Sequence, residues 1–270
     1  KQGVGEIEKC IWLCNYYIEN SEQFLKDNNI LAGDQRGFVT MQPLGIILGI
    51  MPWNFPFWQV FRFAVPSLIV GNGAVLKHAS NVQGCAFSIE SCFLNSGFPN
   101  YLFQNFSISS SRVSSVIENS KISAITLTGS TPAGRSVAEA SGRVLKKTVL
   151  ELGGSDPYII LEDADIEKSV NCSINGRILN AGQSCISAKR LIIVKTLYDQ
   201  FLSFLEDSLS QKIMGDPKDD VDIGPMVSFE ARDEVHRQVL KSIEKGATLI
   251  LGGKIPDLEG AFYPITLLAN

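Results

Sequence analysis

Histidine is scarce in this chain, and its cysteines do not follow a metal-binding spacing. Among 270 residues the histidines are His78 and His236, and none of the six cysteines belongs to a CxxC pair. A structural zinc site uses four cysteine or histidine ligands, which usually come in closely spaced pairs. We therefore expect no structural metal in this protein.

Long apolar runs are also absent. The longest, residues 45–58, contains two prolines and an asparagine, whereas a membrane-spanning helix needs about 20 consecutive apolar residues. The first residues lead directly into an amphipathic helical pattern, without the charged start and apolar centre of a signal peptide. The sequence therefore predicts no membrane segment and a reducing, cytoplasmic environment.

Neither sign of charge is in large excess. The 24 basic and 28 acidic residues give a net charge of −4. No run of lysine and arginine is long enough to follow a phosphate backbone. Nucleic acid is therefore not an expected partner.

Apolar residues, in contrast, make up 45% of the chain, which is enough to bury a core and at this length favours two domains over one. Apolar runs of strand length alternate with helical patterns through the first half. The expected strands are 45–51, 74–76, 101–106 and 122–127, and the expected helices are 7–26, 58–70, 82–95, 111–118 and 132–141. This alternation predicts an α/β fold with a doubly wound parallel sheet.

The same alternation resumes in the second half. Strands are expected at 148–152, 158–161, 191–195 and 248–251, and helices at 166–180, 197–212 and 229–245. The cluster 153–157 lies between the two series, and its glycines permit a change of chain direction. We therefore expect two domains, residues 1–152 and 153–270. Residues 28–37 are polar and contain glycine and aspartate, and residues 38–41 are expected to form a short strand.

Three of the expected strands are followed by motifs with polar residues or glycine. They are PWNFP (52–56), KHAS (77–80) and TGSTPAG (128–134). Open α/β sheets bind ligands at the carboxyl ends of their strands, so these motifs mark a candidate site. TGSTPAG also opens a helix with an N-capping residue and a proline in the first turn, which leaves N–H groups that can bind a phosphate. Most capped helix starts bind only water, and the GxGxxG dinucleotide fingerprint occurs nowhere in the chain.

One glutamate and one cysteine are candidates for chemistry. Glu151 begins the segment ELGG, and Cys185 ends the segment NAGQSC. A cysteine after a glycine-containing turn can present its thiolate to backbone N–H groups, whereas a cysteine on a helix face cannot. The alternative is that Cys185 is a small buried apolar residue and Glu151 a solvated carboxylate.

Five segments in one order resemble the NAD(P)-dependent aldehyde dehydrogenase superfamily: MPWNFPFW, LKHAS, LTGSTPAG, LELGGSDP and NAGQSC. The segments LKHASN, LELGGSDPYI and MGDP…GPM are most similar to its bacterial succinate-semialdehyde dehydrogenase branch. The resemblance covers essentially the whole chain and is strongest over residues 43–190. It implies a Rossmann-like cofactor domain followed by part of an aldehyde dehydrogenase-like catalytic domain.

The resemblance assigns three catalytic positions. The family's nucleophile falls on Cys185, its water-activating carboxylate on Glu151, and its oxyanion-stabilising amide on Asn54. It implies that the thiolate attacks an aldehyde, that N–H groups stabilise the oxyanion, and that the carboxylate activates water to hydrolyse the thioester. The expected reaction is oxidation of succinate semialdehyde to the carboxylic acid.

The resemblance also implies a site for NADP or NAD. Its residues would be Trp53 beside the nucleotide, Lys77 and Ser80 at the adenosine ribose, Gly129 and Ser130 at the pyrophosphate, and Leu152 near the nicotinamide. Many NAD-preferring relatives carry a glutamate at the position of Ser80, where a carboxylate would repel a 2′-phosphate. Serine beside Lys77 therefore tolerates NADP; the alternative is that this serine only begins a helix.

The resemblance implies that Arg62 binds the distal carboxylate of the substrate, because similar semialdehyde dehydrogenases keep an arginine there and a guanidinium can bind a carboxylate with two hydrogen bonds. The alternative is an arginine that extends from a helix flank into solvent. A second family arginine is expected shortly before the nucleophile. Leu179 occupies that place, and Arg177 lies two positions away.

The resemblance implies that segments of the family are missing at both ends of this chain. A homo-oligomer is expected for full-length relatives, with residues 28–43 as part of an oligomerisation arm. The alternative function is a catalytically inert remnant, or an interaction partner that needs a second polypeptide to complete its sheet, because unpaired strand edges favour association.

Overall fold

The computed structural model describes residues 2–33 and 35–270. The chain forms two compact units that divide between Gly153 and Gly154. The roles expected for residues 1–152 and 153–270 stay predictions.

A five-stranded sheet forms the centre of the first unit. Its strands are β3 (Ile46–Met51), β4 (Gly73–His78), β5 (Phe103–Asn105), β6 (Ile122–Gly129) and β7 (Lys147–Leu152). Their order across the sheet is β5-β4-β3-β6-β7, and each neighbouring pair is parallel. The predicted doubly wound parallel sheet is therefore confirmed.

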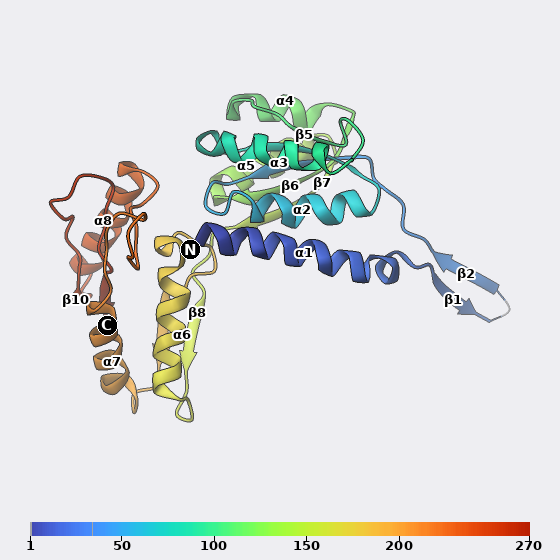
Figure 1. Cartoon of the computed structure of the whole chain (residues 1–270). Helices are drawn as coiled ribbons and strands as arrows, with labels where there is room; N and C mark the ends of the chain where they lie inside the picture. Colours follow the sequence, from blue (N-terminus) through green and yellow to red (C-terminus); the bar gives the residue numbers. More distant parts are fainter. Residues whose placement is uncertain (1, 34) are drawn as a thin grey trace. The chain divides into compact units, whose positions relative to one another are not determined.

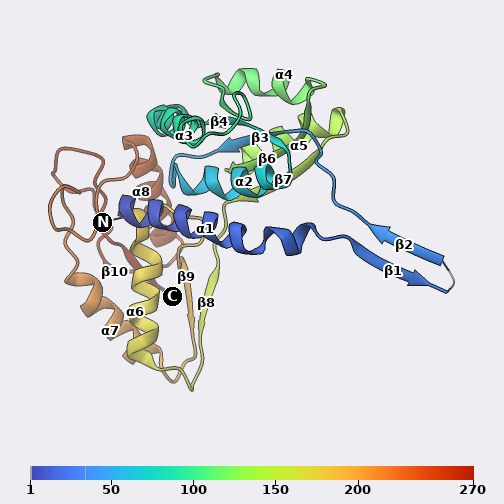
Figure 2. The ribbon, with the colours of Figure 1, turned by 45° about the vertical axis from the view of Figure 1, so that its right-hand side comes forward.

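Helices cover both faces of this sheet. α2 (Trp58–Ile69) and α3 (Gln83–Asn95) pack on one face, and α4 (Val113–Glu118) and α5 (Thr131–Arg143) on the other. The short 3₁₀ helices η1 (Ser80–Val82) and η2 (Ser110–Arg112) precede α3 and α4. α1 (Gln2–Leu25) lies along α2, on the side away from the sheet (Figures 1 and 2).

Residues 28–32 and 35–39 pair as a β-hairpin that extends from the end of α1 (Figures 1 and 2). β1 (Asn28–Ala32) pairs antiparallel with β2 (Gln35–Val39), so the strand expected at 38–41 was wrong in its bounds and β1 was missed. The reason is that pairing across the turn satisfies the backbone of a polar segment that has no apolar pattern of its own. Leu31 and Phe38 are 81% and 66% exposed. That the hairpin belongs to an oligomerisation arm stays a prediction.

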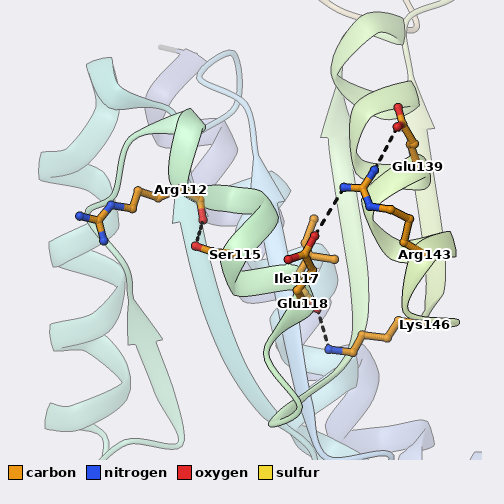
Figure 3. Close-up of polar contacts among 7 residues, drawn as sticks. All are labelled: Arg112, Ser115, Ile117, Glu118, Glu139, Arg143 and Lys146. Carbon is orange, nitrogen blue, oxygen red and sulfur yellow. Dashed lines mark hydrogen bonds and ion pairs between the residues drawn. The ribbon is translucent and has the colours of Figure 1, made fainter.

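Two basic residues, Arg143 at the end of α5 and Lys146 just after it, contact α4 and the residue that follows it (Figure 3). Lys146 Nζ donates to the Ile117 carbonyl at 2.6 Å and to the Asn119 carbonyl at 2.5 Å, at the end of α4. Arg143 lies 3.0 Å from Glu139 and 3.5 Å from Glu118. A cation is favourable at a helix C-terminus, where the carbonyl groups concentrate negative charge. These contacts hold α4 and α5 together on one face of the sheet.

The second unit contains two strand pairs and three α-helices in the part of the chain that the structure describes. β8 (Pro157–Ile160) is parallel to β9 (Arg190–Ile193), and β10 (Thr248–Leu251) is antiparallel to β11 (Leu267–Ala269). The helices are α6 (Ile166–Ile178), α7 (Tyr198–Ser210) and α8 (Phe229–Glu244), with the 3₁₀ helix η3 (Leu179–Gly182) after α6. α6 and α7 share a core around the fully buried Phe201. β11 was not expected, because a strand of three residues is defined only by its pairing with β10.

Candidate active site

Three neighbouring strands end at one edge of the sheet, and the motifs lie there. β3 leads into the turn 52–56, β4 into residues 79–80, and β6 into the start of α5. β3 lies between β4 and β6. From β3 the chain builds β4 and β5 on one side, and it then crosses to build β6 and β7 on the other. Such a change in strand order opens a crevice at the carboxyl edge, where α/β sheets bind ligands.

The first turn of α5 presents backbone N–H groups at this edge. Ser130 caps the helix, since its Oγ accepts a hydrogen bond from the Ala133 N–H at 3.4 Å. At Gly134 an added Cβ would lie 2.6 Å from Leu152 Cδ2, so a larger residue there would require the Leu152 side chain to shift. Gly129 pairs with Leu152 across the two strands. The helix start can therefore hold an anion beside the end of β7.

Lys77 and Ser80 lie at the end of β4, the former half-buried and the latter exposed. Burial lowers the pKa of the Lys77 ammonium group. A partly desolvated cation attracts an anion more strongly than a fully hydrated one, because less water screens it. The pair offers a cation and a hydroxyl group to an anionic ligand.

Arg62 on α2 reaches across to β6 and β7. Its Nη2 donates to Thr128 Oγ1 at 3.1 Å, and its Nη1 lies 3.8 Å from Glu151 Oε2. Thr128 and Glu151 are themselves partners in the sheet. The side chains of Arg62 and Glu151 are 37% and 55% exposed, so the ion pair is weak and both groups stay accessible to a ligand.

Trp53 and Asn54 are half-buried in the turn between β3 and α2. Two residues with no predicted role contact this turn and the helix start that follows it, namely His78 on β4 and Glu6 on α1. Alternation along β4 places His78 on the face opposite Lys77, where a buried histidine needs hydrogen-bond partners. No sequence signal indicated Glu6, which is 51 positions from the backbone it contacts.

Cys185 lies in the second unit, in a turn that follows α6 and η3. Asn180 and Ala181 before it have φ values of 53° and 51°, a left-handed backbone that non-glycine residues seldom adopt. Arg177 Nη1 donates to the Gly182 carbonyl at 3.0 Å, which braces this turn from α6.

Further contacts hold the residues around Cys185. Gln183 Oε1 accepts from the Val227 N–H at 2.9 Å, and Ser187 Oγ donates to the Gly182 carbonyl at 3.3 Å. Lys189 Nζ donates to the Cys185 carbonyl at 3.3 Å and to the Gly154 carbonyl at 2.5 Å. The half-buried thiol is therefore carried by a segment that several side chains fix in place.

The other cysteines belong to helices: Cys10 and Cys14 to α1, Cys85 and Cys92 to α3, and Cys172 to α6. Burial raises the pKa of the Cys10 thiol to about 12, with the Glu6 charge as a second cause. Burial also raises the pKa of Cys14 and Cys85. These three thiols are correspondingly poor nucleophiles at neutral pH.

No group of three or more histidine, cysteine, aspartate or glutamate side chains within residues 2–33 and 35–270 could hold a metal ion. No helix there is long and apolar enough to cross a membrane.

The first unit thus brings most of the predicted residues to one edge of its sheet. Asn54, Lys77, Ser130 and Glu151 come from four different segments, whereas Cys185 belongs to the second unit. The model of the aldehyde dehydrogenase family matches residues 1–270. The chain belongs to the aldehyde dehydrogenase family. The resemblance that the five segments indicated is therefore confirmed.

Curated relatives within this family include succinate-semialdehyde dehydrogenases. The chain is 43% identical over 270 residues to the probable NADP(+) succinate-semialdehyde dehydrogenase of Synechocystis, covering 100% of the chain and 60% of the relative. It is 44% identical over 270 residues to the NAD(P)+ succinate semialdehyde dehydrogenase Sad of Escherichia coli, covering 58% of that protein. The chain spans about three fifths of the length of these relatives.

Solved structures show the same fold. The succinic semialdehyde dehydrogenase of Streptococcus pyogenes, in complex with NADP+, matches 98% of the chain at 37% identity and a TM-score of 0.95. Gox0499, studied for its cofactor and substrate selection, matches 98% at 38% identity, also with a TM-score of 0.95. The chain covers 58% of each of these two structures.

Proposed function

We propose that the chain oxidises an aldehyde, succinate semialdehyde, to its carboxylic acid with NADP or NAD. The observation that carries this proposal is the convergence of Asn54, Lys77, Ser130 and Glu151 on one sheet edge in a member of this family. The succinate-semialdehyde dehydrogenases among its relatives support the choice of substrate.

The proposed chemistry uses three side chains. The Cys185 thiolate attacks the aldehyde carbonyl carbon and forms a tetrahedral thiohemiacetal. The Asn54 side-chain N–H and the Cys185 backbone N–H stabilise its oxyanion. A dinucleotide held at the start of α5 would supply the hydride acceptor for oxidation of this adduct to a thioester. Glu151 then takes a proton from water, which attacks the thioester and releases the acid and the thiolate.

The residues of the first unit fit a phosphate-bearing dinucleotide. The α5 N-terminus, capped by Ser130, presents N–H groups to a pyrophosphate, and Leu152 lies beside it for the nicotinamide end. Lys77 and the exposed Ser80 suit an adenosine ribose that carries a 2′-phosphate, and Trp53 lies on the adjoining turn. Arg62 is proposed to bind the distal carboxylate of the substrate, exchanging its weak pairing with Glu151 for a stronger one.

Replacing Glu151 with glutamine should preserve the first turnover and slow the later ones, because water must be deprotonated only after the thioester has formed. Mixing the Glu151→Gln variant with NADP+ and succinate semialdehyde should give a rapid burst of absorbance from reduced cofactor, followed by a slow steady state. The matched control is Glu139→Gln, which alters a glutamate that pairs only with Arg143 among the ion pairs described. An unchanged steady-state rate in Glu151→Gln would remove Glu151 from the mechanism. A native chain without turnover would favour the inert alternative.

Replacing Ser80 with glutamate should reverse the cofactor preference. Lys77 can form a charge-assisted hydrogen bond to a 2′-phosphate, and such bonds contribute about 1.5–3 kcal/mol, or roughly 10–100-fold in affinity. A carboxylate at position 80 adds repulsion between like charges. Calorimetric titration of NADP and NAD should show NADP binding at least as tightly in the native chain, and NAD more tightly in the variant. Ser88→Glu adds the same charge on the exposed side of α3 and should leave the preference intact; a clear NAD preference in the native chain would contradict the prediction.

A further inference from the structure

His78 is a buried histidine whose two ring nitrogens both face backbone carbonyl groups. It is 1% exposed. Nδ1 lies 3.1 Å from the Met51 carbonyl oxygen, and Nε2 lies 2.9 Å from the Pro56 carbonyl oxygen. The ring therefore bridges the last residue of β3 and the last residue of the turn 52–56.

The same turn is held at both of its ends by further contacts. The Met51 carbonyl also accepts the Ala79 N–H at 3.0 Å, which ties the end of β3 to the end of β4. Beyond the turn, Glu6 Oε1 accepts the N–H groups of Phe57 and Trp58, each at 2.8 Å, at the start of α2. With both ends of the turn anchored, the His78 ring helps to fix the distance between the Met51 and Pro56 carbonyl groups.

The hydrogen-bonding chemistry of the ring fits this role. Both partners are acceptors, so a neutral imidazole donates to one of them and an imidazolium to both. Burial is the largest influence on the pKa of His78 and lowers it, and the Lys77 charge acts in the same direction. The two carbonyl groups and the Glu6 charge act in the opposite direction. In either state the ring keeps a hydrogen bond to the Met51 or the Pro56 carbonyl, which a purely apolar side chain cannot make.

We propose that His78 is a positioning residue, which holds the Pro52–Pro56 turn so that the Asn54 amide reaches the oxyanion of the substrate. This inference rests on the proposed function, because it assigns Asn54 to the oxyanion. The His78 ring itself contacts the backbone carbonyl groups of Met51 and Pro56 at the two ends of the turn. An oxyanion donor displaced by about 1 Å can cost about 100-fold in rate, so a bridge across the two ends of the turn has a catalytic consequence.

The kinetic test is a double-mutant cycle between His78→Phe and Asn54→Ala. Phenylalanine is a ring of similar size without either ring nitrogen, so we expect kcat to fall about 10–100-fold with the KM for succinate semialdehyde nearly unchanged. In the Asn54→Ala background the same substitution should cost little more, because the donor that His78 positions is already absent. Additive losses in kcat would overturn the proposal.

A second readout does not require activity. Hydrogen exchange of the Trp53, Asn54 and Phe55 amides should be faster in His78→Phe than in the native chain, while exchange in β6 stays unchanged. His78→Gln retains donors on one nitrogen and should show intermediate exchange and intermediate kcat. The control Gln83→Leu removes hydrogen bonds to the His78 and Ala79 carbonyls without touching the turn, and should leave both readouts as in the native chain.

The two readouts separate failure of this inference from failure of the proposed function. Unchanged exchange in the turn of a folded His78→Phe variant would overturn the positioning role. If Asn54→Ala leaves kcat unchanged, the proposed oxyanion donor is wrong, and the inference that His78 aligns it falls too. In that case faster exchange in His78→Phe would show only that the histidine holds the turn.

Discussion

Replacing Cys185 with alanine is expected to reduce aldehyde oxidation by several orders of magnitude, because without the thiolate no covalent adduct with the aldehyde can form. Binding of NADP, measured by calorimetry, should be unchanged, since the proposed cofactor residues all belong to the first unit. The control Cys92→Ala removes an exposed thiol from α3 and should retain the native rate. Retention of most of the activity in Cys185→Ala would refute the assignment of the nucleophile.

Thiol reactivity tests the same assignment without turnover. Cys185 should react first with iodoacetamide under native conditions, because the proposed mechanism makes its half-buried thiol the nucleophile, whereas burial raises the pKa of Cys10 to about 12. Peptide mapping by mass spectrometry after short exposures gives the order of labelling. Faster labelling of Cys10, or of the exposed Cys92 and Cys172, would contradict the prediction.

A single methyl group on β3 is expected to destabilise the first unit. An added Cβ at Gly49 would lie 2.2 Å from Phe63 Cζ, and Phe63 is held in the core between α2, α3 and the sheet. We expect Gly49→Ala to lower the free energy of unfolding by about 1–3 kcal/mol, as overpacking of a tight core does. Urea unfolding followed by tryptophan fluorescence measures this unit alone, because Trp12, Trp53 and Trp58 all belong to it.

Gly73→Ala is the matched control for this prediction. It makes the same substitution on β4 of the same sheet, where an added Cβ would meet Ile46 Cγ1 at 3.6 Å, an ordinary contact. Its effect on the unfolding free energy should be small, because no neighbour must move. Equal stability of the two variants would show that the core relaxes around Gly49 and that the close approach of Phe63 has no energetic consequence.

Much of the first unit could be predicted from the sequence because its signals are local. The strands β3, β4 and β6 are short apolar runs separated by helical patterns, and this alternation leads to a parallel sheet. The segments around Asn54, Lys77 and Ser130 follow or end those strands, and Glu151 lies near the end of β7, so the edge on which they meet follows from the topology. The order of five short segments was enough to indicate the family.

Only the tertiary structure showed which side chains hold these segments in place. The contacts of Glu6 with the start of α2, of His78 with Met51 and Pro56, and of Arg62 with Glu151 join residues that are far apart in the sequence. The hairpin β1–β2 and the strand β11 likewise depend on pairing partners and carry no apolar periodicity of their own. Local patterns determined the order of strands, helices and motifs along the chain, because each of these elements depends mainly on residues that are close in the sequence. The hydrogen bonds that fix the turn around Asn54 form only once the packed sheet has brought distant groups within about 3 Å.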